Sequence, residues 1–152
     1  RAYNFHTATE DYPGRDAHHF AVYRGAVEYG ATLHVMKKKV DSGMIIDVYR
    51  YKLSKHARPA DLHKESLNCA FILFEKYIKA LLSEKHIKPL VSINWCQKQK
   101  GTRALFRSMC KISHDISKEE FEKRVKAFSH PEHKNLYTLI CGQKFFLENF
   151  ER

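Results

Sequence analysis

Apolar residues recur along the chain with helical and strand spacing, and the longest helical pattern lies at residues 59–84. In an amphipathic helix, apolar side chains three or four positions apart share the face that packs against the core. The residues that follow this rule here are Leu67, Ala70, Phe71, Phe74, Ile78, Leu81 and Leu82. Pro59 fits the start of such a helix, because proline is accepted in the first turn. We therefore predict a long helix over residues 59–84 that buries this face.

A second helix is predicted over residues 16–29. Asp16 suits its first turn, and Gly30 stands where the helix would end. The apolar residues that would share its buried face are Ala17, Phe20, Ala21 and Val27.

Strand patterns surround this second helix. Residues 1–3 can form only the end of a strand, which leads into a polar loop at residues 6–15. Residues 31–38 and 44–53 are rich in β-branched and apolar side chains, and they predict two strands joined by a tight turn at residues 40–43. This order of strand, helix, strands and long helix is typical of α/β proteins.

The last third of the chain predicts smaller elements. Residues 89–105 show no regular pattern, and Trp95 among them is expected to be a packing anchor. Ser117 opens a short helix, because the sequence Ser-Lys-Glu-Glu is a capping box. Residues 136–140 and 144–147 predict a terminal hairpin.

The composition is that of a compact soluble domain, with a strong positive charge. The chain has 152 residues, 43% of them hydrophobic, and a formal net charge of +10. Most of that charge lies after residue 53. An anionic partner, such as a phosphorylated substrate or a nucleic acid, would therefore bind mainly to the part of the chain after residue 53. No apolar run approaches the roughly 18 residues of a membrane-spanning helix. The start has no secretory pattern, so we expect a cytoplasmic protein without a membrane partner.

Cysteine and histidine spacing predicts no metal site. Cysteines in CxxC pairs mark zinc and redox sites, but those of this chain stand singly, as reduced thiols would: Cys69, Cys96, Cys110 and Cys141. Four histidines are considered as metal ligands, but none has metal-ligand spacing together with a second metal-binding motif. They are His18, His19, His130 and His133.

The candidate chemistry lies near the start of the chain. Asn4 and His6 alternate with Phe5, so on an extended strand they point to one face while Phe5 points to the core. An amide N–H and a protonated imidazole can both donate to a developing oxyanion. Asp41 could hold the imidazole charged and accept protons through water. Taken alone, an Asn-x-His pair at a strand end more often caps a loop than forms a site. His34 could line the pocket, but a histidine in this position is more often a core or surface residue.

Several short motifs follow one another in the first third of the chain. They are Asn4-Phe5-His6, Tyr12-Pro13-Gly14, Tyr29-Gly30, Ala31-Thr32-Leu33-His34 and Val40-Asp41-Ser42-Gly43 with Ile45 and Ile46. In this order they resemble the formyltransferase family, which includes methionyl-tRNA formyltransferase, glycinamide ribonucleotide formyltransferase and the sugar-nucleotide N-formyltransferases. A later segment is similar to the family's helix and hairpin strand through Arg124, Lys126, Ala127, Phe128, Tyr137 and Thr138. Thr7 stands where most members have proline, so the loop after His6 lacks the constraint of that ring.

The resemblance implies a Rossmann-like α/β catalytic domain, partial over residues 1–95, and a mixed carboxyl-terminal extension over residues 96–152. It places Asn4, His6 and Asp41 in the positions of the catalytic trio, and Val40 and Asp41 in positions that bind the formyl donor, 10-formyltetrahydrofolate. The implied reaction moves a formyl group from this donor to a primary amine. An amino-sugar nucleotide or another small, anionic amine is the preferred acceptor.

The resemblance also implies that an upstream strand and loop of the same protein complete the folate site. Without them the sheet is expected to expose an unpaired edge, a state that favours homo-oligomers. Two alternative functions stay open from the sequence. One is a methionyl-tRNA formyltransferase-like protein, although the given sequence is expected to be too short after the hairpin for that enzyme's RNA-binding barrel. The other is a basic, non-catalytic module that binds RNA or another polyanion.

Overall fold

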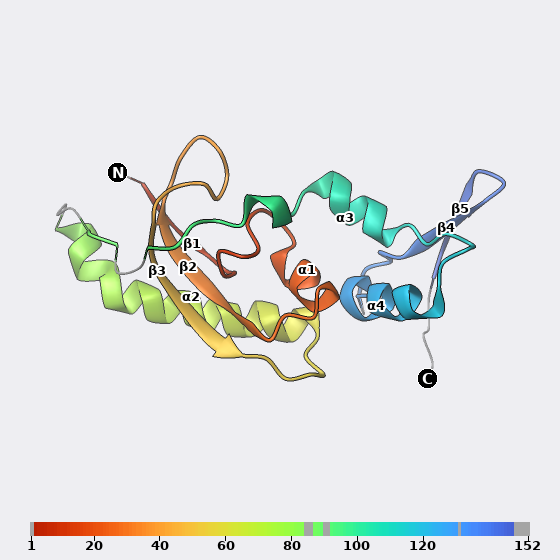
Figure 1. Ribbon diagram of the computed structural model, residues 1–152, viewed down its shortest axis with the longest axis horizontal. Coiled ribbons are helices and arrows are strands. Elements are labelled where there is room, and N and C mark those ends of the chain that lie inside the picture. Colours follow the sequence, from red (N-terminus) through yellow and green to blue (C-terminus); the bar gives the residue numbers. More distant parts are fainter. Residues whose placement is uncertain (1, 84–86, 90–91, 131, 148–152) are drawn as a thin grey trace.

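The computed structural model describes residues 2–83, 87–89, 92–130 and 132–147. Its first part is a three-stranded sheet of order β1-β2-β3, made of β1 (Tyr3–His6), β2 (Glu28–Val35) and β3 (Ile45–Lys52). Both strand pairs are antiparallel. The long helix α2 (Pro59–Leu82) runs along one face of this sheet and contacts all three strands (Figure 1).

The second part extends away from the sheet in Figure 1. Helix α1 (Ala17–Tyr23) lies between the sheet and α4 (Lys118–Phe128), and it packs against both α2 and α4. A short 3-10 turn, η1 (Gln97–Gln99), precedes α3 (Arg103–Cys110). The chain then reaches the two-stranded sheet of β4 (Tyr137–Ile140) and β5 (Gln143–Phe146).

Two predictions for this second part are confirmed. The Ser117 hydroxyl accepts the backbone N–H of Glu120 at 3.2 Å, so Ser117 caps α4 as the capping-box sequence indicates. The terminal hairpin forms around Cys141 and Gly142, whose φ angles of 50° and 79° suit a two-residue type I′ turn. The prediction that residues 89–105 are irregular is wrong at their end, because η1 lies in this range and α3 begins at Arg103 behind its cap Thr102.

Two clusters of buried side chains form the core. One lies between the sheet and α2, and it includes Leu33, Ile46 and Leu73. The other joins elements from both sides of the expected boundary at residue 95: Tyr12, Phe20, Tyr29, Leu62, Cys110, Ile112, Phe128 and Leu136. The four cysteines are free thiols, as predicted. None of the helices within the described ranges is both long and apolar enough to cross a bilayer.

The prediction of a helix over residues 16–29 is wrong in its second half. α1 ends at Tyr23, because Gly25 adopts a φ of 70° and closes a Schellman motif. In this motif the N–H of Ala26 bonds to the carbonyl of Ala21, and the N–H of Gly25 to that of Val22. Gly30 therefore does not stop a helix but lies inside β2.

Val27, expected on the buried face of that helix, lies in the connection to β2 and is 77% exposed. The helical spacing of apolar residues continues past Gly25, but the glycine decides where the helix ends.

The length of α2 is predicted well, but its buried face is not. The side chains of α2 that are buried belong to Pro59, Leu62, Ser66, Cys69, Leu73 and Tyr77. Leu67, Phe71 and Phe74, which we expected in the core, are 50%, 59% and 38% exposed. The helix thus carries two apolar stripes, and the described sheet covers the less apolar one. The predicted end at residue 84 lies outside the described residues.

Candidate active site

Strand β1 delivers the first two candidate residues to one face of the sheet. In the β1–β2 register Asn4 lies opposite His34, and His6 lies opposite Thr32. Phe5 points to the other face, where its ring contacts the ring of Phe74 at 5.8 Å. The alternation expected from the sequence therefore holds at these positions.

Asp41 reaches the same face from a loop that is longer than predicted. The tight turn expected at residues 40–43 is instead the connection from Val35 to Ile45. Asp41 adopts a left-handed φ of 46°, which is uncommon for a residue with a side chain. Gly43 lets this loop fold back on β2, because a Cβ there would lie 1.6 Å from the carbonyl oxygen of Val35.

The carboxylate of Asp41 lies between two imidazoles. Its Oδ2 is 3.6 Å from Nδ1 of His6, and its Oδ1 is 3.4 Å from Nε2 of His34. Asp41 is only 5% exposed and His34 only 2%. The sequence analysis left the role of His34 open, and the structure adds it to the site as a buried neighbour of Asp41.

The surroundings of Asp41 favour its charged form. Burial alone would raise the pKa of this carboxyl, but its contact with His34 and the charge of His6 outweigh that effect. The backbone N–H of Gly14 also donates to Oδ2 at 2.6 Å. Together these groups lower the pKa of Asp41, so the site holds a carboxylate at neutral pH.

His6 has an oxygen acceptor near each ring nitrogen. Its Nε2 donates to the carbonyl of Tyr12 at 3.0 Å, and its Nδ1 faces Asp41. Burial lowers the pKa of His6, and the negative charge of Asp41 acts in the opposite direction. The ring is thus a weakly basic imidazole whose protonated form is matched by two acceptors.

Asn4 completes the polar group. Its Nδ2 lies 3.1 Å from Nε2 of His34, whose Nδ1 is bonded to the carbonyl of Val35. An amide nitrogen carries two N–H bonds, so one remains for a ligand. The structure therefore brings Asn4, His6 and Asp41 together, with His34 between Asn4 and Asp41.

The family resemblance implies that Val40, beside Asp41, binds the formyl donor. The Val40 side chain is 60% exposed, and its carbonyl accepts the ammonium of Lys100 at 2.7 Å. Val40 thus precedes Asp41 in the chain, and its side chain is open to a ligand.

Two further residues of the site were not predicted as such. The ring of Trp95 lies 5.6 Å from that of His6 and 4.9 Å from that of His34. Gln97 Nε2 donates to the backbone carbonyl of Asp41 at 2.6 Å. The residue pattern identified Trp95 only as a packing anchor, because nothing local to residues 89–105 shows which loop they contact.

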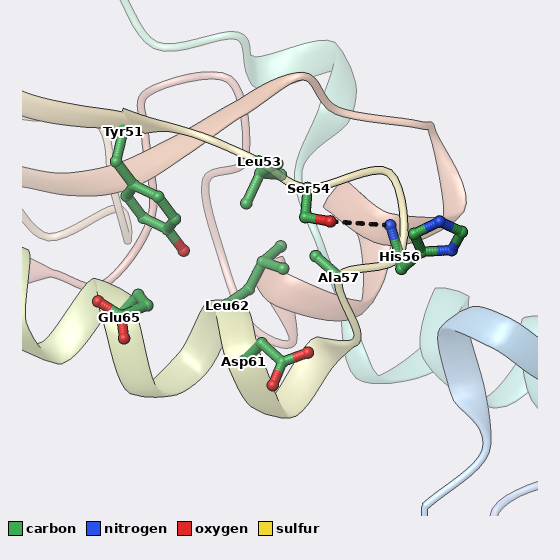
Figure 2. Close-up of a pocket in the computed structure, with 8 residues that line it drawn as sticks. All are labelled: Tyr51, Leu53, Ser54, His56, Ala57, Asp61, Leu62 and Glu65. Atoms are coloured by element: carbon green, nitrogen blue, oxygen red, sulfur yellow. Dashed lines mark hydrogen bonds between the residues drawn. The ribbon is translucent and has the colours of Figure 1, made fainter.

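A cavity of about 620 Å³ borders the site along the Asp41 loop. Ser42, Gly43 and Met44 line it on one side, Trp95 on another, and Lys37 adds a positive charge. A second cavity of about 360 Å³ lies where β3 leads into α2, lined in part by Tyr51, Asp61, Leu62 and Glu65 (Figure 2). None of the trio lines either cavity, but Ser42 of the first cavity follows Asp41 in the chain, and the Trp95 ring of the first cavity contacts the ring of His6.

Among the described residues, one group of side chains has ligand atoms close enough to hold a metal ion. It comprises His130, Glu132 and His133, with ligand atoms within 4.8 Å of one another. Nδ1 of His130 already accepts the backbone N–H of Glu132 at 3.0 Å. The group lies beyond the end of α4 and shares no residue with the trio.

Sequence comparison alone identifies no relative: no family model and no curated protein matches the chain. The fold, however, is similar to that of several solved structures. A 4-N formyltransferase from Francisella tularensis superposes with a TM-score of 0.74 at 25% identity, covering 95% of this chain and 60% of that one. A sugar N-formyltransferase from a Shewanella species gives a TM-score of 0.78 at 18% identity, covering 97% of this chain and 60% of that one.

A third structure was solved with ligands. It is the N-formyltransferase from Helicobacter canadensis in complex with folinic acid and dTDP-3-aminofucose. It superposes with a TM-score of 0.69 at 24% identity and covers 93% of this chain and 52% of that one. This chain thus spans about 60% of the length of the first two relatives. The resemblance to the formyltransferase family is confirmed at the level of the fold: over its described length, this chain folds as N-formyltransferases do.

Proposed function

We propose that this chain carries the catalytic trio of an N-formyltransferase, which moves a formyl group from 10-formyltetrahydrofolate to a primary amine. The observation that carries the proposal is the buried carboxylate of Asp41, placed 3.6 Å from His6 on the strand end that also holds Asn4. The shared fold with N-formyltransferases supports it.

Each member of the trio has a chemical role in this proposal. The amine attacks the formyl carbon, and negative charge develops on the formyl oxygen. The free N–H of Asn4 and the positive charge of His6 stabilise that oxygen. Asp41 favours the charged form of His6, against the burial that lowers the pKa of this ring. Asp41 also accepts the proton of the amine through water, and the proton returns to the nitrogen that leaves.

The donor is proposed on the basis of the relatives. The Helicobacter canadensis enzyme was crystallised with folinic acid, and a sugar 3-N-formyltransferase with a TM-score of 0.70 was crystallised with 5-N-formyl-tetrahydrofolate. We place Val40 and Asp41 against the donor, because the exposed Val40 side chain offers an apolar contact beside the trio.

The acceptor is proposed to be a small, anionic amine, in the first place an amino-sugar nucleotide. The complex of the Helicobacter canadensis enzyme with dTDP-3-aminofucose supports this class. In this chain, Lys37 lines the cavity beside the Asp41 loop, and the net charge of +10 favours an anion.

An upstream part of the same protein is proposed to complete the catalytic domain. Within the described residues, β1 pairs with a neighbour on one edge only. The apolar stripe of Leu67, Phe71 and Phe74 is exposed on α2, and Phe74 contacts Phe5 of β1. Parallel strands added at β1, with a helix over this stripe, would give the Rossmann-like sheet that the motifs imply. We also propose that residues 1–95 are the catalytic part and that the protein is cytoplasmic. Where the edge of β1 stays unpaired, we propose that it pairs with a second copy of the protein.

The test is a transfer assay on the protein extended by its upstream reading frame. Formyl-labelled donor is incubated with amino-sugar nucleotides and with small neutral amines, and the formylated product is measured. We expect product with an anionic amine, and a loss of about 100-fold or more in His6→Ala. Absence of product with every amine, in a folded protein that binds the donor, would contradict the proposal.

A further inference from the structure

Residues 95–101 lie across the two loops that carry the site, and we call this segment the clasp. To the loop after β1 it makes three backbone bonds. The N–H of Cys96 donates to the carbonyl of Glu10 at 2.9 Å, and that of Gly101 to Pro13 at 2.8 Å. The N–H of Arg15 donates to the carbonyl of Gly101 at 3.2 Å.

The same segment is bonded to the Asp41 loop through its side chains. Trp95 Nε1 donates to the carbonyl of Gly43 at 2.8 Å, and Gln97 Nε2 donates to that of Asp41 at 2.6 Å. Lys100 adds the bond to Val40. The clasp thus fixes the distance between the strand end that carries His6 and the loop that carries Asp41.

Trp95 and Asp41 contact the same two imidazoles. The indole lies edge-on to His6 and to His34, at interplanar angles of 66° and 83°. The carboxylate lies near one nitrogen of each ring. Trp95 therefore limits the orientations that the two rings can adopt, and it keeps water from their faces.

The bond from Gln97 acts on the backbone of Asp41. A left-handed φ is unfavourable for a residue with a side chain, so it persists only where neighbouring groups hold it. The carbonyl of Asp41 is held by Gln97, and its carboxylate by Gly14. Without Gln97 the backbone of Asp41 could relax and carry the carboxylate away from His6.

We infer that Trp95 and Gln97 are positioning residues of this site, with opposite effects on His6: Trp95 excludes water from its ring, and Gln97 holds Asp41 beside it. The inference rests on the proposed function for its meaning in catalysis. Its structural content is testable without transfer activity, because the titration of His6 reports both effects.

The primary test is an NMR titration of the His6 ring in this chain, assigned with His6→Gln. Burial lowers the pKa of His6 and Asp41 raises it. Trp95→Ala admits water, so the pKa of His6 is expected to rise by about half a unit or more, while Trp95→Phe restores most of the original value. Gln97→Leu lets Asp41 move away, so the pKa of His6 is expected to fall.

A matched control is Lys98→Ala, because Lys98 is exposed in the same segment. It is expected to leave the titration of His6 unchanged. Variants that merely loosened the fold would move His6 in one direction only, towards the value of an unfolded chain. Equal shifts of one sign in Trp95→Ala and Gln97→Leu, or no shift in either, would overturn the inference.

The second readout is the transfer rate of the extended protein. Gln97→Leu is expected to lower kcat about tenfold and to leave KM within about twofold, as misplacement of a catalytic group does. If no variant or parent transfers formyl groups but the opposite shifts of His6 are found, the proposed function fails and the positioning role stands. If transfer is measured but kcat is unaffected by Gln97→Leu, the positioning role is overturned.

Discussion

The surroundings of Asp41 and the outer face of α2 differ in how well other residues of the described chain cover them. Asp41 and His34 are 5% and 2% exposed, and each has partners within the chain. On α2, by contrast, Leu67 and Phe71 are 50% and 59% exposed, and within the described residues β1 has a strand partner on one edge only. The polar site is closed, and the apolar face beside it is not.

The difference follows from the cost of burying each kind of group. A buried carboxylate without partners is strongly unfavourable, so Asp41 requires its hydrogen bonds wherever the loop folds. An exposed phenylalanine forgoes only the gain of burial, about 1.5–3 kcal/mol. The described residues can therefore hold their charged groups in place while they leave an apolar face exposed.

The largest expected effect is that of Asp41→Asn in the extended protein. The amide neither favours the charged form of His6 nor accepts a proton, so kcat is expected to fall about 10²–10⁴-fold with little change in KM. Steady-state kinetics measure this. A rise in KM alone would mean that Asp41 only binds the acceptor.

The two faces of α2 offer a matched pair. Leu73 is 1% exposed, and Leu73→Ala is expected to lower the free energy of unfolding by about 2–5 kcal/mol. Phe71→Ala is expected to change it by about 0.5 kcal/mol or less in this chain. Urea unfolding compares them. Similar losses in both would show that Phe71 is covered in solution and would remove the contrast.

The histidines between α1 and α2 make the fold sensitive to acid. The ring of His18 lies 4.4 Å from that of His19 and 5.2 Å from that of His63. Burial, followed by these two neighbours, lowers the pKa of His18 to about 4. In the unfolded chain the group has its ordinary pKa of 6.5, so only the unfolded state takes up the proton between these values.

Stability is therefore complete above pH 6.5 and is lost as the pH falls towards 4, by roughly 2–3 kcal/mol for this one group. His18→Gln is expected to reduce the loss, and the exposed His56→Gln is the control. Urea unfolding at pH 7.5 and 5 measures it. An equal loss in His18→Gln and the parent protein would assign the acid sensitivity to other groups.

The smallest effect concerns the residue that ends α1. Gly25 has a φ of 70° and open space where a Cβ would lie, so Gly25→Ala costs only the strain of that φ, about 1 kcal/mol. Gly25→Asn is expected to cost less, because asparagine tolerates this conformation better. Thermal unfolding of the two variants measures the difference. Equal stability of parent and Gly25→Ala would contradict the strain assigned to the left-handed φ at the end of α1.

Sequence patterns predict the local features of this molecule well. The alternation of Asn4, Phe5 and His6 identifies a strand face, and Ser117 identifies the start of α4, since both rules act within a few residues. The motif order also leads to the fold that the comparisons confirm. The catalytic roles of the trio stay predictions.

What the sequence does not predict depends on contacts between distant segments. Two stripes of α2 have helical spacing, and only the packed sheet decides that Leu73 is buried and Phe71 is not. Gln97 reaches Asp41 across 56 positions, which no local pattern records. The end of α1 is the exception, because it depends on a local signal. Gly25 is a possible helix end in the sequence, but the apolar spacing that continues past it favours a longer helix.

The most direct test of the contrast between the two regions is a calorimetric titration with 5-formyl-tetrahydrofolate, a stable analogue of the proposed donor. It is carried out on this chain and on the chain extended by its upstream reading frame. We expect weak binding to this chain, because the trio is in place but the surface that would orient the folate is not, and tight binding of one folate to the extended protein. Tight, stoichiometric binding by this chain alone would contradict the account, since it would show that the donor site is complete within these residues.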